Sequence, residues 1–300
     1  MNPLRIGTRR SPLAIAQAEE IRVMLAARDV ASELVPMSTS GDEGALPGSS
    51  PQGLKGLWID AILDALESGD IDVAVHSAKD LPAEDDEGFV LAAVPPRADP
   101  ADVLVCRDGG ELRPGATIGT SSLRRRAQLL AAFPGLRMVD LRGNVGTRLR
   151  KVDEGEVDAA VLAAAGLQRL GLVPDHQRPL PLDAMVPAPG QGCLALQCRD
   201  DDEGTIAMVA DLDDPVSHRA LDTERSLMWR LGGGCALPLG GFAMVSAESI
   251  RLTAVIATPD GSRVIRSTVD GATPEDVAAV AAKHLIADGA EEILTEVAAE

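Results

Sequence analysis

Aromatic side chains are scarce in this 300-residue sequence, which has two tryptophans, three phenylalanines and no tyrosine. Its cores must therefore be filled by Val, Leu, Ile and Ala, and few rings are available to stack on nucleic-acid bases. The four cysteines form no CxxC pair, and the four histidines show no metal-ligand spacing. Both absences argue against a disulfide scaffold and a zinc site.

Long apolar runs are also missing, because none approaches the roughly 18 residues that a membrane helix requires. The N-terminal stretch MNPLRIGTRRSPL lacks the apolar core of a signal peptide, so we expect a cytoplasmic protein. Basic residues are few: 28 Lys and Arg stand against 46 Asp and Glu, a net charge of −18. The surface field would repel a phosphate backbone, which argues against nucleic acid as a partner.

The sequence has instead the pattern of an α/β protein, with 45% hydrophobic and 25% charged residues and a length suited to two or three domains. Short apolar runs alternate with amphipathic stretches through the first two thirds, which predicts mostly parallel strands and covering helices. The expected strands are 4–6, 33–37, 71–75, 90–94, 117–119, 137–141 and 158–162. The expected helices are 11–28, 57–68, 122–133, 144–154 and 215–231.

Two proline-rich segments, VPPRADPAD near residue 95 and VPAPGQG near residue 187, divide the chain. They indicate paired hinges between two lobes, with the chain returning to the first lobe after Gly192. Beyond residue 215 the pattern predicts an α+β unit whose antiparallel strands are 241–245, 250–257 and 263–268, with a helix from Thr273. The predicted domains are therefore 1–97 with 192–213, 98–191, and 214–300.

The segment 38–56, STSGDEGALPGSSPQGLKG, is rich in Gly, Ser and Pro and has no apolar periodicity. It is expected to form a mobile loop. Composition alone leaves a lid over a site and a passive linker equally open.

Arginines gather at three predicted helix starts that each follow a strand, in GTRRSPLA, GTSSLRRRAQLL and LRGNVGTRLRK. The expected N-caps of the first and third starts are Ser11, with Pro12 at the first helical position, and Asn144. The second start has three candidate capping hydroxyls, on Thr120, Ser121 and Ser122. Helix N-termini, hydroxyls and arginines at the carboxyl edge of a sheet bind anions. One such start could be a surface salt-bridge site. Three in an acidic protein predict a site for several carboxylates.

The run DIDVAVHSAKDLP places His76, Ser77, Lys79 and Asp80 directly after a predicted buried strand. Polar residues in this position are typical of an α/β active site. An ordinary solvated turn, with Asp80 paired to Lys79, explains the run almost as well.

Three cysteines are candidate nucleophiles: Cys193, Cys198 and Cys235. Cys235 differs from the others because it lies in RLGGGCALPLGG, where glycine neighbours remove side-chain cover and leave the sulfur accessible to a large group. The sequence has no Walker loop and no G-x-S-x-G elbow.

Seven motifs occur together and in order: IGTRRSPLA, KGLW, AVHSAKDLP, GTSSLRRRAQL, LRGNVGTRL, PGQG and LGGGCALPLGGFA. Through them the chain resembles the hydroxymethylbilane synthase (porphobilinogen deaminase) family, from about residue 4 to 245. The resemblance implies three domains, of which two are lobes like those of type II periplasmic binding proteins and the last is α+β. It also implies a transferase that condenses four porphobilinogen molecules head to tail, releases ammonia, and hydrolyses the product to linear hydroxymethylbilane.

The resemblance further implies roles for individual residues. Cys235 would carry a dipyrromethane primer in thioether linkage, and Asp80 would be the catalytic carboxylate. Cofactor contacts would come from Lys79, Thr120, Ser122, Arg124, Arg125 and Arg142. Substrate contacts would come from Arg9, Ser11, Lys55, Trp58, Arg148 and Gln191. We expect no metal, a monomer, and a hand-off of product to uroporphyrinogen-III synthase.

Three positions depart from the family pattern: Trp58, where Phe is usual, and Gln197 and Gly232, where Glu is usual. They leave open how a lid packs and how the primer loop is held. Two rival functions remain at this point. A two-lobed protein that traps a polyanion has no use for Cys235 or Asp80, and a phosphate-handling enzyme using the GTSS helix start lacks evident metal or nucleotide ligands.

Overall fold

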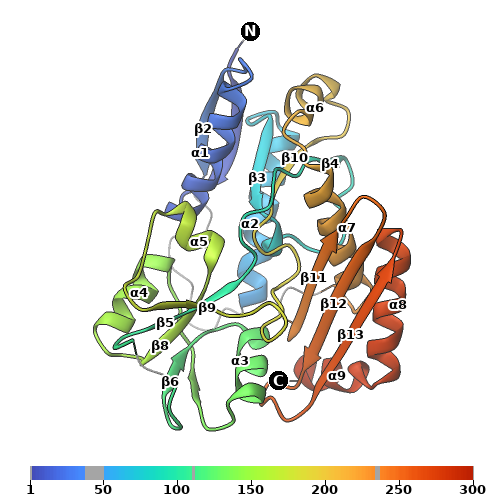
Figure 1. Cartoon of the computed structure of the whole chain (residues 1–300). Helices are drawn as coiled ribbons and strands as arrows, with labels where there is room; N and C mark the ends of the chain where they lie inside the picture. The colour runs from blue at the N-terminus through green and yellow to red at the C-terminus, as the bar shows by residue number, and fades with distance from the viewer. Residues whose placement is uncertain (1, 38–50, 110–111, 234–236, 300) are drawn as a thin grey trace. The chain divides into compact units, whose positions relative to one another are not determined.

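The computed structural model describes residues 2–37, 51–109, 112–233 and 237–299 (Figure 1). The chain forms two compact units, Met1–Arg97 with Cys193–His218, and Ala98–Gly192 with Arg219–Glu300. The division into three domains stays a prediction. None of the described helices combines the length and the apolar composition that spanning a membrane would need.

The first unit is built on a five-stranded sheet in the order β2-β1-β3-β10-β4. Its strands are β1 (Leu4–Arg9), β2 (Ser32–Met37), β3 (Val73–Ser77), β4 (Phe89–Ala93) and β10 (Leu194–Arg199). β1 is parallel with β2 and β3, whereas β10 is antiparallel to β3 and β4. The helices of this unit are α1 (Pro12–Ala26), α2 (Pro51–Glu67), the one-turn η1 (Ala78–Asp80) and α6 (Glu203–Ala210).

Both faces of this sheet are covered. On one face Ile6 and Leu196 belong to a buried cluster with Ile21 of α1. On the other face Ala74 belongs to a cluster with Leu66 of α2. Strands buried on both faces are continuously apolar rather than alternating, which is why the first two thirds of the sequence show short apolar runs.

The second unit contains a five-stranded sheet in the order β7-β6-β8-β5-β9. Its strands are β5 (Asp102–Cys106), β6 (Thr117–Gly119), β7 (Arg137–Val139), β8 (Ala159–Ala163) and β9 (Gln177–Pro179). β6 is parallel with β7 and β8, and β5 is antiparallel to β8 and β9. The helices beside it are α3 (Leu123–Ala132), α4 (Val145–Asp153) and α5 (Ala164–Arg169).

β5 and β10 hold the same position in the two sheets, fourth in each order, and each opposes its neighbours. Each follows one of the two proline-rich segments, and β10 returns the chain to the first sheet as predicted. Neither strand was predicted from the sequence. Their apolar runs are short and buried, and periodicity does not identify such a segment.

The second unit also contains a three-stranded antiparallel sheet, which confirms the predicted C-terminal architecture. Its strands are β11 (Leu239–Val245), β12 (Ile250–Ala257) and β13 (Val264–Gly271). The remaining helices are α7 (Pro215–Arg230), α8 (Pro274–Ala287) and α9 (Ala290–Ala299). Figure 1 shows α8 running alongside β13. The α/β class is likewise confirmed.

Two of the boundaries that differ from the prediction bear on the candidate site. α2 begins at Pro51 rather than at residue 57, so residues 51–56 of the predicted loop are helical, and residues 38–50 lie outside the described ranges. β3 ends at Ser77, so His76 and Ser77 belong to the strand that they were expected to follow. Their backbone pairs with β10, whose existence the local sequence did not reveal.

Candidate active site

The carboxyl ends of β1 and β3 meet at one edge of the first sheet, because the two strands are parallel neighbours. The last residues of each strand and the residues that follow them therefore come together. They line a pocket of about 120 Å³ within the first unit. Its polar lining comprises Arg9, Ser11, Gln17, His76, Ser77, Lys79 and Asp80.

Two local features fix the pocket walls. Ser11 is the N-cap of α1, as predicted, and its hydroxyl accepts a hydrogen bond from the Ala14 N–H at 3.2 Å. Gln17, one turn further along α1, donates its amide N–H to the Ser77 hydroxyl at 3.2 Å. The start of α1 is therefore tied to the end of β3, directly before the residues Lys79 and Asp80.

The short helix η1 carries Lys79 and Asp80 into the pocket lining. It begins where the Ala78 N–H donates to the Cys193 carbonyl at 3.1 Å, and it closes where Leu81 donates to the Ala78 carbonyl at 3.2 Å. Both charged side chains are half-buried. A carboxylate beside a lysine and an arginine can bind cationic or N–H groups while the cations bind carboxylates.

His76 is buried in the wall of this pocket. Burial lowers its pKa to about 4, against smaller opposite effects from Gln197 and the Asp80 charge. The imidazole is therefore neutral near pH 7. Its Nε2 atom and the Gln197 Oε1 atom are buried without a hydrogen bond to any described residue.

The start of α3 in the second unit has the capping hydroxyls that the sequence predicted. Ser122 is the N-cap and accepts a hydrogen bond from the Arg125 N–H at 3.4 Å. Thr120 is buried, and its hydroxyl accepts from the Ser122 N–H at 3.2 Å. Both hydroxyls thus hold the backbone at the point where the arginine cluster begins.

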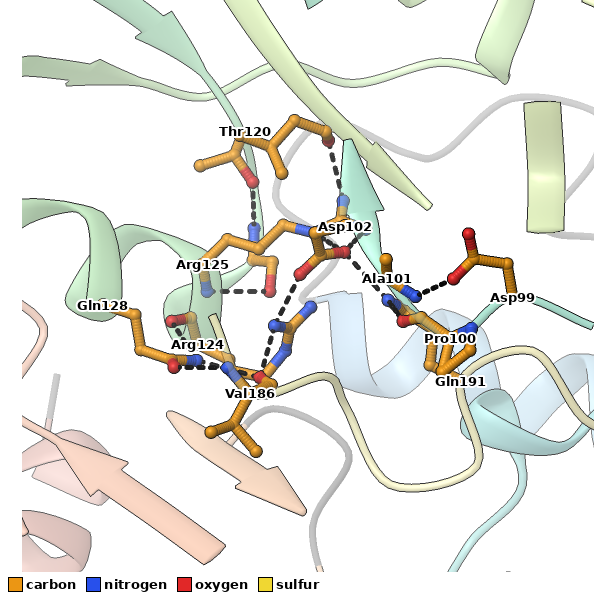
Figure 2. Close-up of polar contacts among 12 residues, drawn as sticks. Asp99, Pro100, Ala101, Asp102, Thr120, Arg124, Arg125, Gln128, Val186 and Gln191 are labelled. Atoms are coloured by element: carbon orange, nitrogen blue, oxygen red, sulfur yellow. Dashed lines mark hydrogen bonds and ion pairs between the residues drawn. The ribbon is translucent and has the colours of Figure 1, made fainter. Parts of the chain in front are cut away.

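Arg124 and Arg125 are buried and share Asp102 as their ionic partner (Figure 2). Arg124 Nη1 lies 2.7 Å from Asp102 Oδ2, and Arg125 Nη2 lies 2.8 Å from Asp102 Oδ1. Burial raises the pKa of the Asp102 carboxyl, but the two guanidinium groups lower it by more, so the pKa lies below its ordinary value and the group stays ionised.

The remaining predicted residues of the second unit lie in different surroundings. Gln191 is buried and donates its amide N–H groups to the Pro100 carbonyl at 2.7 Å and to Asp102 at 2.9 Å. Arg142 is exposed, 3.9 Å from Asp140. Arg148, on α4, donates from Nε to the Gly143 carbonyl at 2.9 Å. The structure thus gathers Gln191 with Arg124 and Arg125, while Arg142 and Arg148 lie around the start of α4.

Three predicted residues cannot be placed from side-chain contacts. Cys235 lies outside the described residues. Lys55 and Trp58 belong to α2, where the structure describes their backbone alone. The other candidate nucleophiles, Cys193 and Cys198, are 1% and 0% exposed, and burial raises the pKa of the Cys198 thiol to about 12. Neither is an accessible thiolate at neutral pH.

Sequence reasoning missed Asp102 and Gln17. Asp102 carries the one available signal, because it is an acidic residue at the start of an apolar run, VLVC, that becomes a buried strand. Its partners lie 22, 23 and 89 positions away along the chain. Local spacing cannot reveal pairs at such separations.

Comparison with known proteins identifies the family. The family model described as "Porphobilinogen deaminase, dipyromethane cofactor binding domain" matches residues 4–207, and the one described as "Porphobilinogen deaminase, C-terminal domain" matches residues 219–287. The chain belongs to the porphobilinogen deaminase family. The predicted family is thereby confirmed, and the matched cofactor-binding domain is named for the group that the sequence resemblance implied.

Curated porphobilinogen deaminases match over nearly their whole length. The protein from Brevibacillus brevis is 42% identical, covering 100% of this chain and 99% of its own. The protein from Acidithiobacillus ferrooxidans is 44% identical, covering 98% of each. Among solved structures, a periplasmic substrate-binding protein from Coxiella burnetii aligns with a TM-score of 0.42 and 16% identity, over 72% of this chain and 94% of that one.

Proposed function

We propose that this porphobilinogen deaminase family member is a hydroxymethylbilane synthase. It condenses four porphobilinogen molecules head to tail, with loss of ammonia at each step, and releases linear hydroxymethylbilane by hydrolysis. The observation that carries the proposal is the match of both family domains, across residues 4–207 and 219–287. The product is a precursor in tetrapyrrole and haem biosynthesis.

Asp80 is the proposed catalytic residue. Loss of ammonia from porphobilinogen leaves an azafulvene cation, which an ionised carboxylate near the pyrrole N–H stabilises. The new carbon–carbon bond forms between the azafulvene cation and a ring carbon of the other pyrrole. The same carboxylate accepts the proton that this ring carbon loses. The half-buried position of Asp80 in a pocket with Arg9 and Lys79 supports this role.

Arg9, Ser11 and Arg148 are proposed to hold substrate carboxylates, together with Gln191, Lys55 and Trp58. Each porphobilinogen brings an acetate and a propionate, so guanidinium groups suit the substrate because they bind carboxylates in bidentate geometry. For Arg9 and Ser11 the supporting observation is that both line the Asp80 pocket. Gln191 already uses its amide nitrogen on Pro100 and Asp102.

The donors in the second unit fit a dipyrromethane, whose carboxylates need N–H and O–H groups. Arg124 Nε is buried without a hydrogen-bond partner among the described residues, which leaves a cationic donor available to an anion. When bound, the dipyrromethane supplies the primer to which substrate units are joined. Cys235 is the proposed attachment point, and Lys79, Thr120, Ser122, Arg124, Arg125 and Arg142 the proposed contacts.

Intact-mass spectrometry tests the covalent cofactor. Protein purified from a host that makes porphobilinogen should carry an added dipyrromethane, give colour with Ehrlich's reagent, and lose both in Cys235→Ser. An unmodified wild-type chain would contradict the proposal and would favour the rival in which a two-lobed protein traps a polyanion.

Asp80→Asn tests the catalytic role. The variant should keep the added mass but lose activity by about 100-fold or more, because general acid–base groups contribute at least this much. Asp60→Asn, on the exposed side of α2, is the control and should keep normal turnover. Normal product formation by Asp80→Asn would remove Asp80 from the catalytic step.

The cytoplasmic location, the monomeric state and the hand-off of product to uroporphyrinogen-III synthase are further parts of the proposal. Hydroxymethylbilane cyclises spontaneously. An enzyme that receives it directly would prevent the loss of product to this side reaction. Light scattering of the holo-protein tests the monomer directly, and a dimer mass would correct it.

A further inference from the structure

Asp102 is fully buried at the start of β5 and is the common acceptor for three side chains (Figure 2). Its Oδ1 atom accepts from Arg125 Nε at 3.1 Å, from Arg125 Nη2 at 2.8 Å and from Gln191 at 2.9 Å. Its Oδ2 atom accepts from Arg124 Nη1 at 2.7 Å. The two arginines therefore contact the same carboxylate in different ways.

Arg125 donates to the protein from all three of its side-chain nitrogen atoms. Its Nε and Nη2 atoms both donate to Asp102, and its Nη1 atom donates to the Val161 carbonyl at 2.8 Å. Every nitrogen of this guanidinium group thus has an internal acceptor, on β5 or on β8. The Nε–Nη2 edge of Arg125 is therefore taken up by Asp102, and a ligand could bind this edge only by displacing a bond that already satisfies a buried charge.

Arg124 is held by one end only. Its Nη1 atom donates to Asp102 and to the Val186 carbonyl at 2.8 Å. Its Nε atom is buried without a partner among the described residues, and the structure gives its Nη2 atom no hydrogen bond to them. Nε and Nη2 form the edge of a guanidinium group that binds a carboxylate through two parallel hydrogen bonds.

The charges of this cluster also do not balance. Two buried guanidinium groups share a single carboxylate, which leaves one excess positive charge. A buried charge without a partner lowers stability, and a ligand carboxylate on the unpaired Nε–Nη2 edge of Arg124 would remove that cost.

We propose that Asp102 is a positioning residue that gives the two arginines different roles. Asp102 is the internal counter-charge of Arg125. It also holds Arg124 through Nη1, so that the Nε–Nη2 edge of Arg124 remains unpaired and can bind one carboxylate of the polypyrrole. This inference rests on the proposed function, which supplies the carboxylate. Of the two adjacent arginines, only Arg124 is then a direct ligand, which removes Arg125 from the cofactor contacts that the family resemblance implied.

Three matched lysine substitutions separate these roles: Arg124→Lys, Arg125→Lys and, as control, Arg126→Lys. All three keep the positive charge on the same helix, and Arg126 is exposed. Each protein is prepared from a host unable to make porphobilinogen. Its thermal unfolding is measured, and the rate at which added porphobilinogen produces the dipyrromethane mass is followed by intact-mass spectrometry.

Arg124→Lys should slow the mass increase at least about tenfold, the effect of losing one charged hydrogen-bond pair, because lysine can replace Nη1 but not the two-donor edge. Its Tm should stay close to that of Arg126→Lys. Arg125→Lys should lower the Tm by about 5 °C or more, since a buried ion pair loses its geometry, yet below that Tm it should gain mass at nearly the control rate.

Asp102→Asn tests the positioning directly. At a temperature where circular dichroism shows this variant fully folded, it should still gain mass more slowly than Arg126→Lys. A normal rate would overturn the positioning role. Equal rates for the Arg124 and Arg125 variants, or equal losses of Tm, would overturn the division between the arginines. The Tm comparison uses apo-protein, so it decides the role of Arg125 even if the wild-type chain gains no mass, which would instead refute the proposed function.

Discussion

His76 is a buried titratable side chain directly before the turn that carries Asp80. Its folded-state pKa of about 4 lies below the ordinary value of 6.5, chiefly because burial disfavours the imidazolium. Between these two pH values the unfolded chain binds a proton at His76 and the folded chain does not. The contribution of His76 to the free energy of unfolding is therefore complete above pH 6.5 and is lost as the pH falls toward 4.

We predict that lowering the pH from 7 to 4.5 reduces the free energy of unfolding by about 2 to 3 kcal/mol through His76. In urea titrations at the two pH values, His76→Gln should show a correspondingly smaller loss than the wild type. His176→Gln is the control, because it removes an exposed imidazole rather than a buried one. Identical losses in wild type and His76→Gln would mean that His76 is protonated at its ordinary pKa in the folded protein.

At the scale of elements, the turn between β12 and β13 packs closely on α3. A Cβ atom added to Gly261 would lie 2.5 Å from the Ala131 nitrogen and 2.8 Å from the Ala127 carbonyl oxygen, both backbone atoms of α3. Gly261 also has φ of +72°, a conformation that favours glycine. The C-terminal sheet thus supports the helix that carries Arg124 and Arg125.

We predict that Gly261→Ala costs more than about 2 kcal/mol, because a positive φ alone costs roughly 1 to 2 kcal/mol and the backbone contact adds to it. Gly171→Ala is the matched control in the same unit, since Gly171 has φ of +63° but no atom within 4 Å of the added carbon. Chemical unfolding of both variants measures the difference. Equal losses would show that the turn can move away from α3 at no cost.

Local sequence signals predicted most of these elements. The N-caps Ser11 and Asn144 are confirmed, because a cap depends on residues three positions apart. Of the three candidate hydroxyls before α3, Ser122 is the N-cap. The strands 250–257 and 263–268 were likewise predicted, but the approach of the turn between them to α3 was not. Neither this contact nor the ion pairs of Asp102 is encoded in any short stretch, because each joins segments that are distant in the chain.

At the scale of the whole molecule, the chain builds its first unit from two separate segments, Met1–Arg97 and Cys193–His218. The second segment supplies β10, which lies between β3 and β4. β4 is at the edge of the sheet and has β10 as its neighbour, so its main-chain groups depend on a strand made about 100 residues later. Residues 98–192 lie between the two segments and belong to the other unit.

We predict that a chain ending at Gly192 does not form the first sheet, because β3 loses a neighbour and β4 has none. Amide hydrogen exchange should show β3 and β4 unprotected in residues 1–192, and addition of the separate segment 193–300 should restore their protection. A chain ending at Ala247 is the control. It lacks β12 and β13 but keeps β10, so it should lose the C-terminal sheet while β3 and β4 stay protected. Protection of β4 in residues 1–192 alone would show that the sheet forms without β10.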